Sequence, residues 1–93
     1  MYATIRSYSG TELADVLATR ESDIRDAIAA IDGFRAYYLI RTTDGNAVTV
    51  SVFDDQAGAE ESTRVAGEWV RENLSDLSVS PPQVSVGEVA ISF

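Results

Sequence analysis

The sequence contains no cysteine and no histidine, and all seven of its basic residues are arginine rather than lysine. Without cysteine the chain has no disulfide, no thiolate nucleophile and no thiolate ligand for a metal. Without histidine it has no imidazole to ligate zinc or haem iron or to act as a general base. These absences exclude the commonest catalytic and metal-binding groups, and we expect neither a metal site nor a cofactor.

Positive charge is scarce relative to negative charge, because fifteen acidic residues against seven basic ones give a formal net charge of −8. Such a surface repels the phosphates of nucleic acids and of anionic membranes, so neither is an expected partner. Two interpretations of the acidity stay open, namely solubility and adaptation to a habitat of high salt.

Long apolar runs are also missing. No stretch approaches the length of a membrane-spanning helix, and the N-terminus lacks the basic-then-apolar pattern of a secretion signal. We therefore expect a cytoplasmic protein. With 93 residues, 45% of them hydrophobic, the chain is sufficient for one small folded domain over residues 1–93.

The stretch from Phe34 to Phe53 carries the clearest structural signal. Two β-rich segments flank Asp44-Gly45, a dipeptide typical of a tight hairpin turn. A two-residue turn there would place Tyr37, Leu39 and Arg41 on one face with Val48, Val50 and Val52, and Ala36, Tyr38 and Ile40 on the other with Thr49, Ser51 and Phe53. Neither face is then plainly polar, whereas a sheet covered by helices on one side usually has a wet opposite face.

The remaining elements follow from periodicity. Alternation predicts a first strand over residues 1–8 and a last strand over residues 83–93, with a bulge or bend at Gly87. Helical spacing predicts a helix from Thr11, its N-cap, to about residue 31, interrupted near residues 20–23. A second helix is predicted from Asp54-Asp55 to about Leu74, with a glutamate-rich face that is solvated rather than metal-binding. A close approach to the sheet at Gly67 would offset the cost of a glycine inside this helix.

The element order is βαββαβ, which is typical of the ferredoxin-like α+β fold. Right-handed crossovers then place the first and third strands in the middle of a four-stranded antiparallel sheet, with both helices on one face. The other face would expose apolar side chains. We therefore expect a second copy of the chain to cover it, as a two-fold homodimer.

Four segments of the chain resemble the dimeric α/β-barrel superfamily, and within it the small proteins related to antibiotic-biosynthesis monooxygenases (ABM-like domains). They are MYATIRSY at residues 1–8, GFRAYYLIRT at 33–42, VTVSVFDD at 48–55 and ESTRVAGEWVREN at 61–73. The resemblance implies a dimeric α/β barrel with a pocket between the sheet and the two helices of each subunit. Its haem-degrading branch uses a His as iron ligand, so the lack of His argues against haem degradation here.

The resemblance also implies an Asn close to a pocket Trp, on the first strand or the second helix. On the first strand this chain offers Ala3, Ile5 and Ser7 for the pocket, and its only asparagines are Asn46 and Asn73. Trp69 is the matching aromatic residue on the second helix. No catalytic set is matched residue by residue.

Five residues are candidates for ligand binding: Trp69, Tyr37, Tyr38, Arg6 and Arg41. Trp69 lies on an apolar stripe, either as a core residue or as a stacking wall for an aromatic ligand. The two tyrosines are adjacent on a strand, so one faces the helices and the other the dimer interface. Either arginine can hold a ligand carboxylate or form an interface ion pair with Glu88 or Asp54.

Two functions from different classes remain open. One is a dimeric module that binds a small hydrophobic or aromatic ligand between sheet and helices without catalysis. The other is a cofactor-independent monooxygenase acting on an aromatic or quinol substrate. The second requires an enclosed apolar cavity on the order of a few hundred Å³ with Trp69 on its wall. The sequence leaves open whether the protein is an enzyme, because a fold alone does not specify chemistry.

Overall fold

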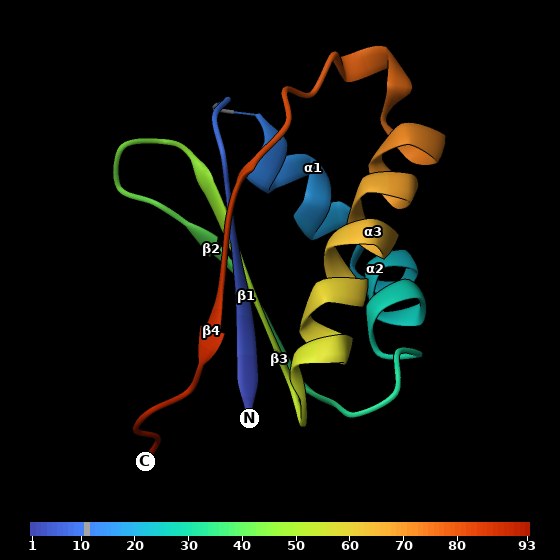
Figure 1. The fold of residues 1–93 in the computed structure, drawn as a ribbon. Coiled ribbons are helices and arrows are strands. Elements are labelled where there is room, and N and C mark those ends of the chain that lie inside the picture. The colour runs from blue at the N-terminus through green and yellow to red at the C-terminus, as the bar shows by residue number, and fades with distance from the viewer. Residues whose placement is uncertain (11) are drawn as a thin grey trace.

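A computed structural model describes residues 1–10 and 12–93, and it has a four-stranded sheet with helices on one face (Figure 1). The elements are β1 (Tyr2–Tyr8), α1 (Leu13–Thr19), α2 (Glu21–Ile28), β2 (Phe34–Arg41), β3 (Ala47–Phe53), α3 (Gln56–Asn73), a 3₁₀ turn (Ser75–Leu77) and β4 (Gln83–Glu88). The strand order is β2-β3-β1-β4 and each neighbouring pair is antiparallel. The predicted ferredoxin-like α+β fold, with β1 and β3 central, is confirmed.

The helices begin and end close to where the sequence predicts. The first predicted helix is divided at Arg20 into α1 and α2, at the interruption in its apolar stripe. Asp55 is the N-cap of α3, and its side chain accepts a hydrogen bond from the backbone N–H of Gly58 at 3.1 Å. The other predicted N-cap, Thr11, lies outside the described residues.

The β2–β3 hairpin is one residue out of register with the predicted pairing. Tyr37 lies opposite Ser51, and Tyr38 lies opposite Val50. The backbone N–H of Thr42 donates to the carbonyl of Asn46 at 3.0 Å, so three residues rather than two form the loop. The last of them, Gly45, has a φ of +88°, which a hairpin of this length requires and glycine adopts without strain.

This shift exchanges the faces of β2 relative to β3, since side chains alternate along a strand. The predicted grouping of Tyr37 with the valines was therefore wrong. Tyr37 and Leu39 point toward the helices together with the buried side chains of Thr49 and Ser51. The opposite face, here called the bare face, contains no charged residue among those described: Ala3, Ile5, Ser7, Ala36, Tyr38, Ile40, Val48, Val50, Val52, Gln83, Ser85 and Gly87.

The last strand is shorter than predicted. β4 ends at Glu88, opposite Tyr2, and the backbone N–H of Val89 still donates to the carbonyl of Met1 at 2.8 Å. Residues 89–93 belong to no strand and continue past β4 as an irregular segment (Figure 1). The predicted bulge at Gly87 was also wrong, because Gly87 pairs regularly with Ala3. The irregularity lies in β2, between Phe34 and Ala36.

The core lies between the sheet and the helices. Its buried apolar residues come from every layer: Tyr8, Leu13, Ala14, Leu17, Ile24, Ile28, Ala47, Phe53, Ala59 and Leu74. α3 lies tightly against the sheet at Gly58, where an added Cβ would lie 3.0 Å from Phe53 Cβ and from the carbonyl oxygen of Asp32. Gly67, where that approach was predicted, faces open space.

The two glycines of α3 should therefore respond in opposite ways to alanine. Gly58→Ala should lower the free energy of unfolding by about 1–3 kcal/mol, because neither the backbone carbonyl nor the buried phenylalanine can move away freely. Gly67→Ala should raise it by up to about 1 kcal/mol, the difference in helix propensity. Urea denaturation of both variants beside the native chain measures this. Equal effects of the two substitutions would contradict the packing at Gly58.

Candidate functional site

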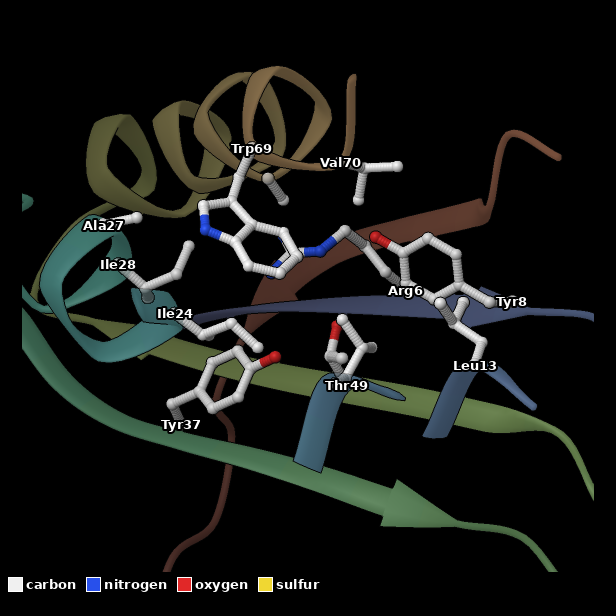
Figure 2. A pocket seen from close by; sticks show the side chains of 12 residues that line it. Arg6, Tyr8, Leu13, Ile24, Ala27, Ile28, Tyr37, Thr49, Trp69 and Val70 are labelled. Atoms are coloured by element: carbon white, nitrogen blue, oxygen red, sulfur yellow. The ribbon is translucent and has the colours of Figure 1, made fainter. Parts of the chain in front are cut away.

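A small cavity lies between the sheet and the helices, with a volume of about 30 Å³. Its polar and aromatic lining comes from both layers: Arg6 and Tyr8 on β1, Tyr37 on β2, Thr49 on β3 and Trp69 on α3 (Figure 2). Aliphatic side chains of the three helices complete the wall. Polar groups and an aromatic wall are thus gathered in an apolar environment, as in many ligand sites.

Arg6 is the most unusual residue of this lining, because its side chain is only 1% exposed. Its two terminal nitrogens donate to hydroxyl oxygens, Nη1 to Ser62 at 3.0 Å and Nη2 to Ser51 at 2.8 Å. A longer contact joins Nη1 to Thr63 at 3.5 Å. These bonds tie β1 to β3 and to α3 through one side chain.

The positive charge of Arg6 has no carboxylate partner within residues 1–10 and 12–93. Burial lowers the pKa of Arg6, and the titratable groups that oppose this effect are the hydroxyls of Tyr8 and Tyr37. A guanidinium nevertheless stays protonated in proteins. The site therefore carries a buried positive charge that only neutral groups solvate, an arrangement that costs folding free energy unless an anion offsets it.

Two buried polar atoms of the cavity residues make no hydrogen bond to any described residue. They are Nε of Arg6 and Oγ1 of Thr49. A buried donor without a partner costs about 1–3 kcal/mol, so such atoms are uncommon in folded proteins. Their presence on one small cavity indicates room for a group that is able to accept hydrogen bonds.

The two tyrosines of the cavity are held in the neutral form. Burial raises the pKa of Tyr37 to about 12, against a smaller opposing effect of the Arg6 charge. Burial also raises the pKa of Tyr8. Figure 2 shows the Tyr8 hydroxyl turned toward Arg6, and the hydroxyls of Tyr37 and Thr49 directed to the space below the Trp69 ring. Both tyrosines are thus available as hydrogen-bond donors at neutral pH.

Trp69 is half-buried and forms one wall of the cavity. Figure 2 shows its six-membered ring over Arg6 and Tyr37, with the indole nitrogen on the side of Ala27 and Ile28. The guanidinium carbon of Arg20 lies 5.4 Å from the ring centroid, within the range of a cation–π contact. Trp69 is therefore neither packed on all sides nor open to solvent.

A groove of about 650 Å³ adjoins the cavity along the edge strand β2. It runs between β2 and the helices α1 and α2, and it shares four lining residues with the cavity: Leu17, Ile24, Ile28 and Tyr37. Phe34, Ala36 and Leu39 add further apolar surface. The groove is large enough for an aromatic ring system, whereas the cavity is not.

Three of the five predicted site residues meet at the cavity, namely Arg6, Tyr37 and Trp69. Tyr38 lies on the bare face with 60% of its surface exposed, and it lines the groove rather than the cavity. Arg41 is exposed and forms an ion pair with Asp15 at 2.7 Å.

Within the described residues, neither arginine forms the predicted ion pair with Glu88 or Asp54. Arg6 faces the helices rather than the bare face. Asp54 pairs with Arg35 instead.

Two cavity residues were missed by sequence reasoning. Tyr8 lies two positions after Arg6 on the same strand, so strand alternation alone would have found it. Thr49 depended on the hairpin register. The first-strand residues expected to face the pocket, Ala3, Ile5 and Ser7, lie on the bare face.

The asparagines that the family resemblance drew attention to are not part of the cavity lining. Asn73 accepts a hydrogen bond from Arg20 at 3.0 Å and donates one to the carbonyl of Trp69 at 2.9 Å. Asn46 directly follows the hairpin loop, where its carbonyl accepts a hydrogen bond from the backbone N–H of Thr42. No cluster of acidic side chains suited to a metal ion occurs in the part of the chain that the structure describes. None of the helices described there is long and apolar enough to cross a membrane.

High pH should destabilise the protein through Tyr37. The unfolded chain loses the tyrosine proton near pH 10 and the folded chain only near pH 12, so the free energy of unfolding should fall as the pH rises between these values. Tyr37→Phe should remove part of this fall, whereas Tyr38→Phe, on the exposed face, should not. Urea denaturation at pH 8, 10 and 11 measures the effect. An identical pH dependence in both variants would contradict the burial of the Tyr37 hydroxyl.

Known protein structures share the fold of this chain, but no family model or curated protein matches its sequence. A monooxygenase from Streptomyces coelicolor, solved in complex with nanaomycin D, has a TM-score of 0.72 and 16% identity, over 99% of this chain and 89% of that one. A mutant of SnoaB, a cofactor-independent oxygenase from Streptomyces nogalater, has a TM-score of 0.63 and 13% identity, over 98% and 92%.

Proteins without a known role share the same architecture. A protein of unknown function from Nitrosomonas europaea has a TM-score of 0.70 and 17% identity, over 99% of this chain and 90% of that one. At such identities the likeness concerns the fold rather than the activity. The chain therefore has a ferredoxin-like α+β fold that monooxygenases and proteins of unknown function share.

Proposed function

We propose that this protein binds a small hydrophobic or aromatic molecule between its sheet and its helices. The observation that carries the proposal is the cavity where Trp69 and Tyr37 meet the unpartnered atoms of Arg6 and Thr49. A folded protein retains such unpartnered atoms at a cost in stability, which a bound ligand would offset. The adjoining groove supplies the apolar surface that a ring system needs.

A panel of aromatic probes tests this proposal by NMR. Trp69 is the only tryptophan, so its indole N–H gives a single assigned signal in a ¹⁵N-labelled sample. Titration with 2-naphthoate and with the neutral 2-naphthamide should shift this signal and the backbone signals of Tyr37 and Thr49. Trp69→Phe should weaken the stronger of the two affinities by about threefold to tenfold, in proportion to lost stacking. The proposal is rejected if neither probe binds with a Kd below about 1 mM.

A second candidate is a cofactor-independent monooxygenase, favoured by the likeness of the fold to oxygenases. Its substrate would be an aromatic molecule or a quinol whose own electrons activate oxygen. Trp69 and Tyr37 would position the substrate and donate a hydrogen bond. The enclosed volume of about 30 Å³ is far below what such a substrate needs, so the groove would have to hold most of it. Oxygen uptake in the presence of a naphthoquinol separates this candidate from simple binding.

We also propose that two copies of the chain associate through the bare face of the sheet. This face has no charged side chain among the described residues and it exposes Ile5, Tyr38 and Ile40. The chain as a whole carries a net charge of −8. Copies that approach through other surfaces would repel one another, so the uncharged face offers the most favourable contact. A two-fold arrangement lets one face cover the same face of its partner.

A charge placed at the centre of the bare face should separate the copies. Ile5→Glu introduces a carboxylate on the central strand β1 and should convert the dimer into a monomer of about 10.0 kDa. Gln56→Glu adds the same charge at an exposed position of α3 and should leave the dimer intact. Sedimentation velocity measures both. If the native chain itself sediments as a 10.0 kDa species, the dimer does not exist.

A further inference from the structure

We propose that the ligand of this protein carries a carboxylate, which enters the cavity beside Arg6 while its apolar body lies in the groove along β2. The inference rests on the ligand site proposed above and names the chemical class of its ligand. It starts from the one buried charge of the described chain that has no opposite charge beside it.

The charge balance of the site favours an anion. Among the described residues Arg6 is the only buried arginine, and its terminal nitrogens donate hydrogen bonds to serine and threonine hydroxyls. Arg20 also lies beside Trp69, but its charge is already paired with Asp23 at 2.8 Å, whereas the charge of Arg6 has no such partner among the described residues. A group that neutralises Arg6 would form a strong charge-assisted hydrogen bond with a guanidinium that is almost fully buried.

The donors around the cavity match the lone pairs of a carboxylate. Nε of Arg6 and the hydroxyl of Thr49 are unpartnered, and the hydroxyl of Tyr37 points to the same space (Figure 2). A carboxylate accepts about four hydrogen bonds and donates none, so it offers an acceptor to each of these groups. A neutral amide of the same shape has one oxygen acceptor and no charge, so it would leave the Arg6 guanidinium without an opposite charge.

The volume of the cavity limits what can enter. Its volume of about 30 Å³ is far below the roughly 300–1,000 Å³ of pockets that hold whole ligands, so it has room for a small polar group only. A carboxylate is such a group. An aromatic ring does not fit there, but the groove that shares Leu17, Ile24 and Ile28 with the cavity has about 650 Å³.

Matched probes test the inference. We expect 2-naphthoate to bind at least about tenfold more tightly than 2-naphthamide, as measured by titration calorimetry at neutral pH. Arg6→Met removes the charge and keeps an unbranched side chain, and this variant should bind the two probes within about twofold of one another. Arg64→Gln removes a charge from an exposed position of α3, so it should keep the tenfold preference.

A second variant tests the inference independently, in case Arg6→Met does not fold. Thr49→Val preserves the shape of a side chain whose hydroxyl has no partner, so it should fold as well as the native chain. We expect it to reduce the affinity for 2-naphthoate by about threefold to tenfold and to leave that for 2-naphthamide unchanged. Thermal melts of both variants establish that they are folded.

The outcomes separate this inference from the proposed function. If both probes bind equally to the native chain, the ligand site stands and the carboxylate is rejected. A preference that survives in folded Arg6→Met, or that is lost in Arg64→Gln, also overturns the role of Arg6. If neither probe binds, the ligand site itself is rejected and the inference falls with it.

Discussion

The buried guanidinium of Arg6 is the interaction on which the arrangement of the two layers depends. The Arg6 side chain extends from β1 toward the helices, and it donates hydrogen bonds both to Ser51 on the neighbouring strand and to Ser62 on α3. Ser62 in turn donates to the carbonyl of Ala59 at 2.6 Å, the same oxygen that accepts from Thr4. Thus a chain of hydroxyl groups, rather than a carboxylate, solvates the charge. A polar inner surface of this kind is expensive in folding free energy, and its retention agrees with a role in binding.

The two faces of the sheet depart from the usual distribution of polarity in a two-layer protein. Besides its apolar core residues, the covered face contains Thr4, Arg6, Thr49 and Ser51, all buried. The bare face is mostly aliphatic. In a monomer a sheet usually buries its apolar side and leaves the polar side in water. The proposed ligand site accounts for the polar residues on the covered face. The proposed dimer accounts for the apolar residues on the bare face.

The site and the glycine contact at Gly58 lie at different parts of α3. Near its N-terminus the helix lies against Phe53 and the carbonyl of Asp32, where a larger residue than glycine would be crowded. Farther along, the helix presents Trp69 to the cavity. The tight contact at one end and the cavity at the other indicate that α3 diverges from the sheet, and the space so created is where the unpartnered polar atoms lie.

The order of elements, an interruption of the first helix and the cap at Asp55 could be predicted from the sequence, because these depend on local spacing and local hydrogen bonds. The lack of His and Cys likewise excluded whole classes of chemistry. That the first helix divides, that Tyr37 faces inward, that Arg6 is buried and that β4 stops at Glu88 became clear only from the three-dimensional structure. One additional residue in the hairpin loop exchanges every side chain of a strand between faces. The length of β4 depends on a partner strand far away in the sequence.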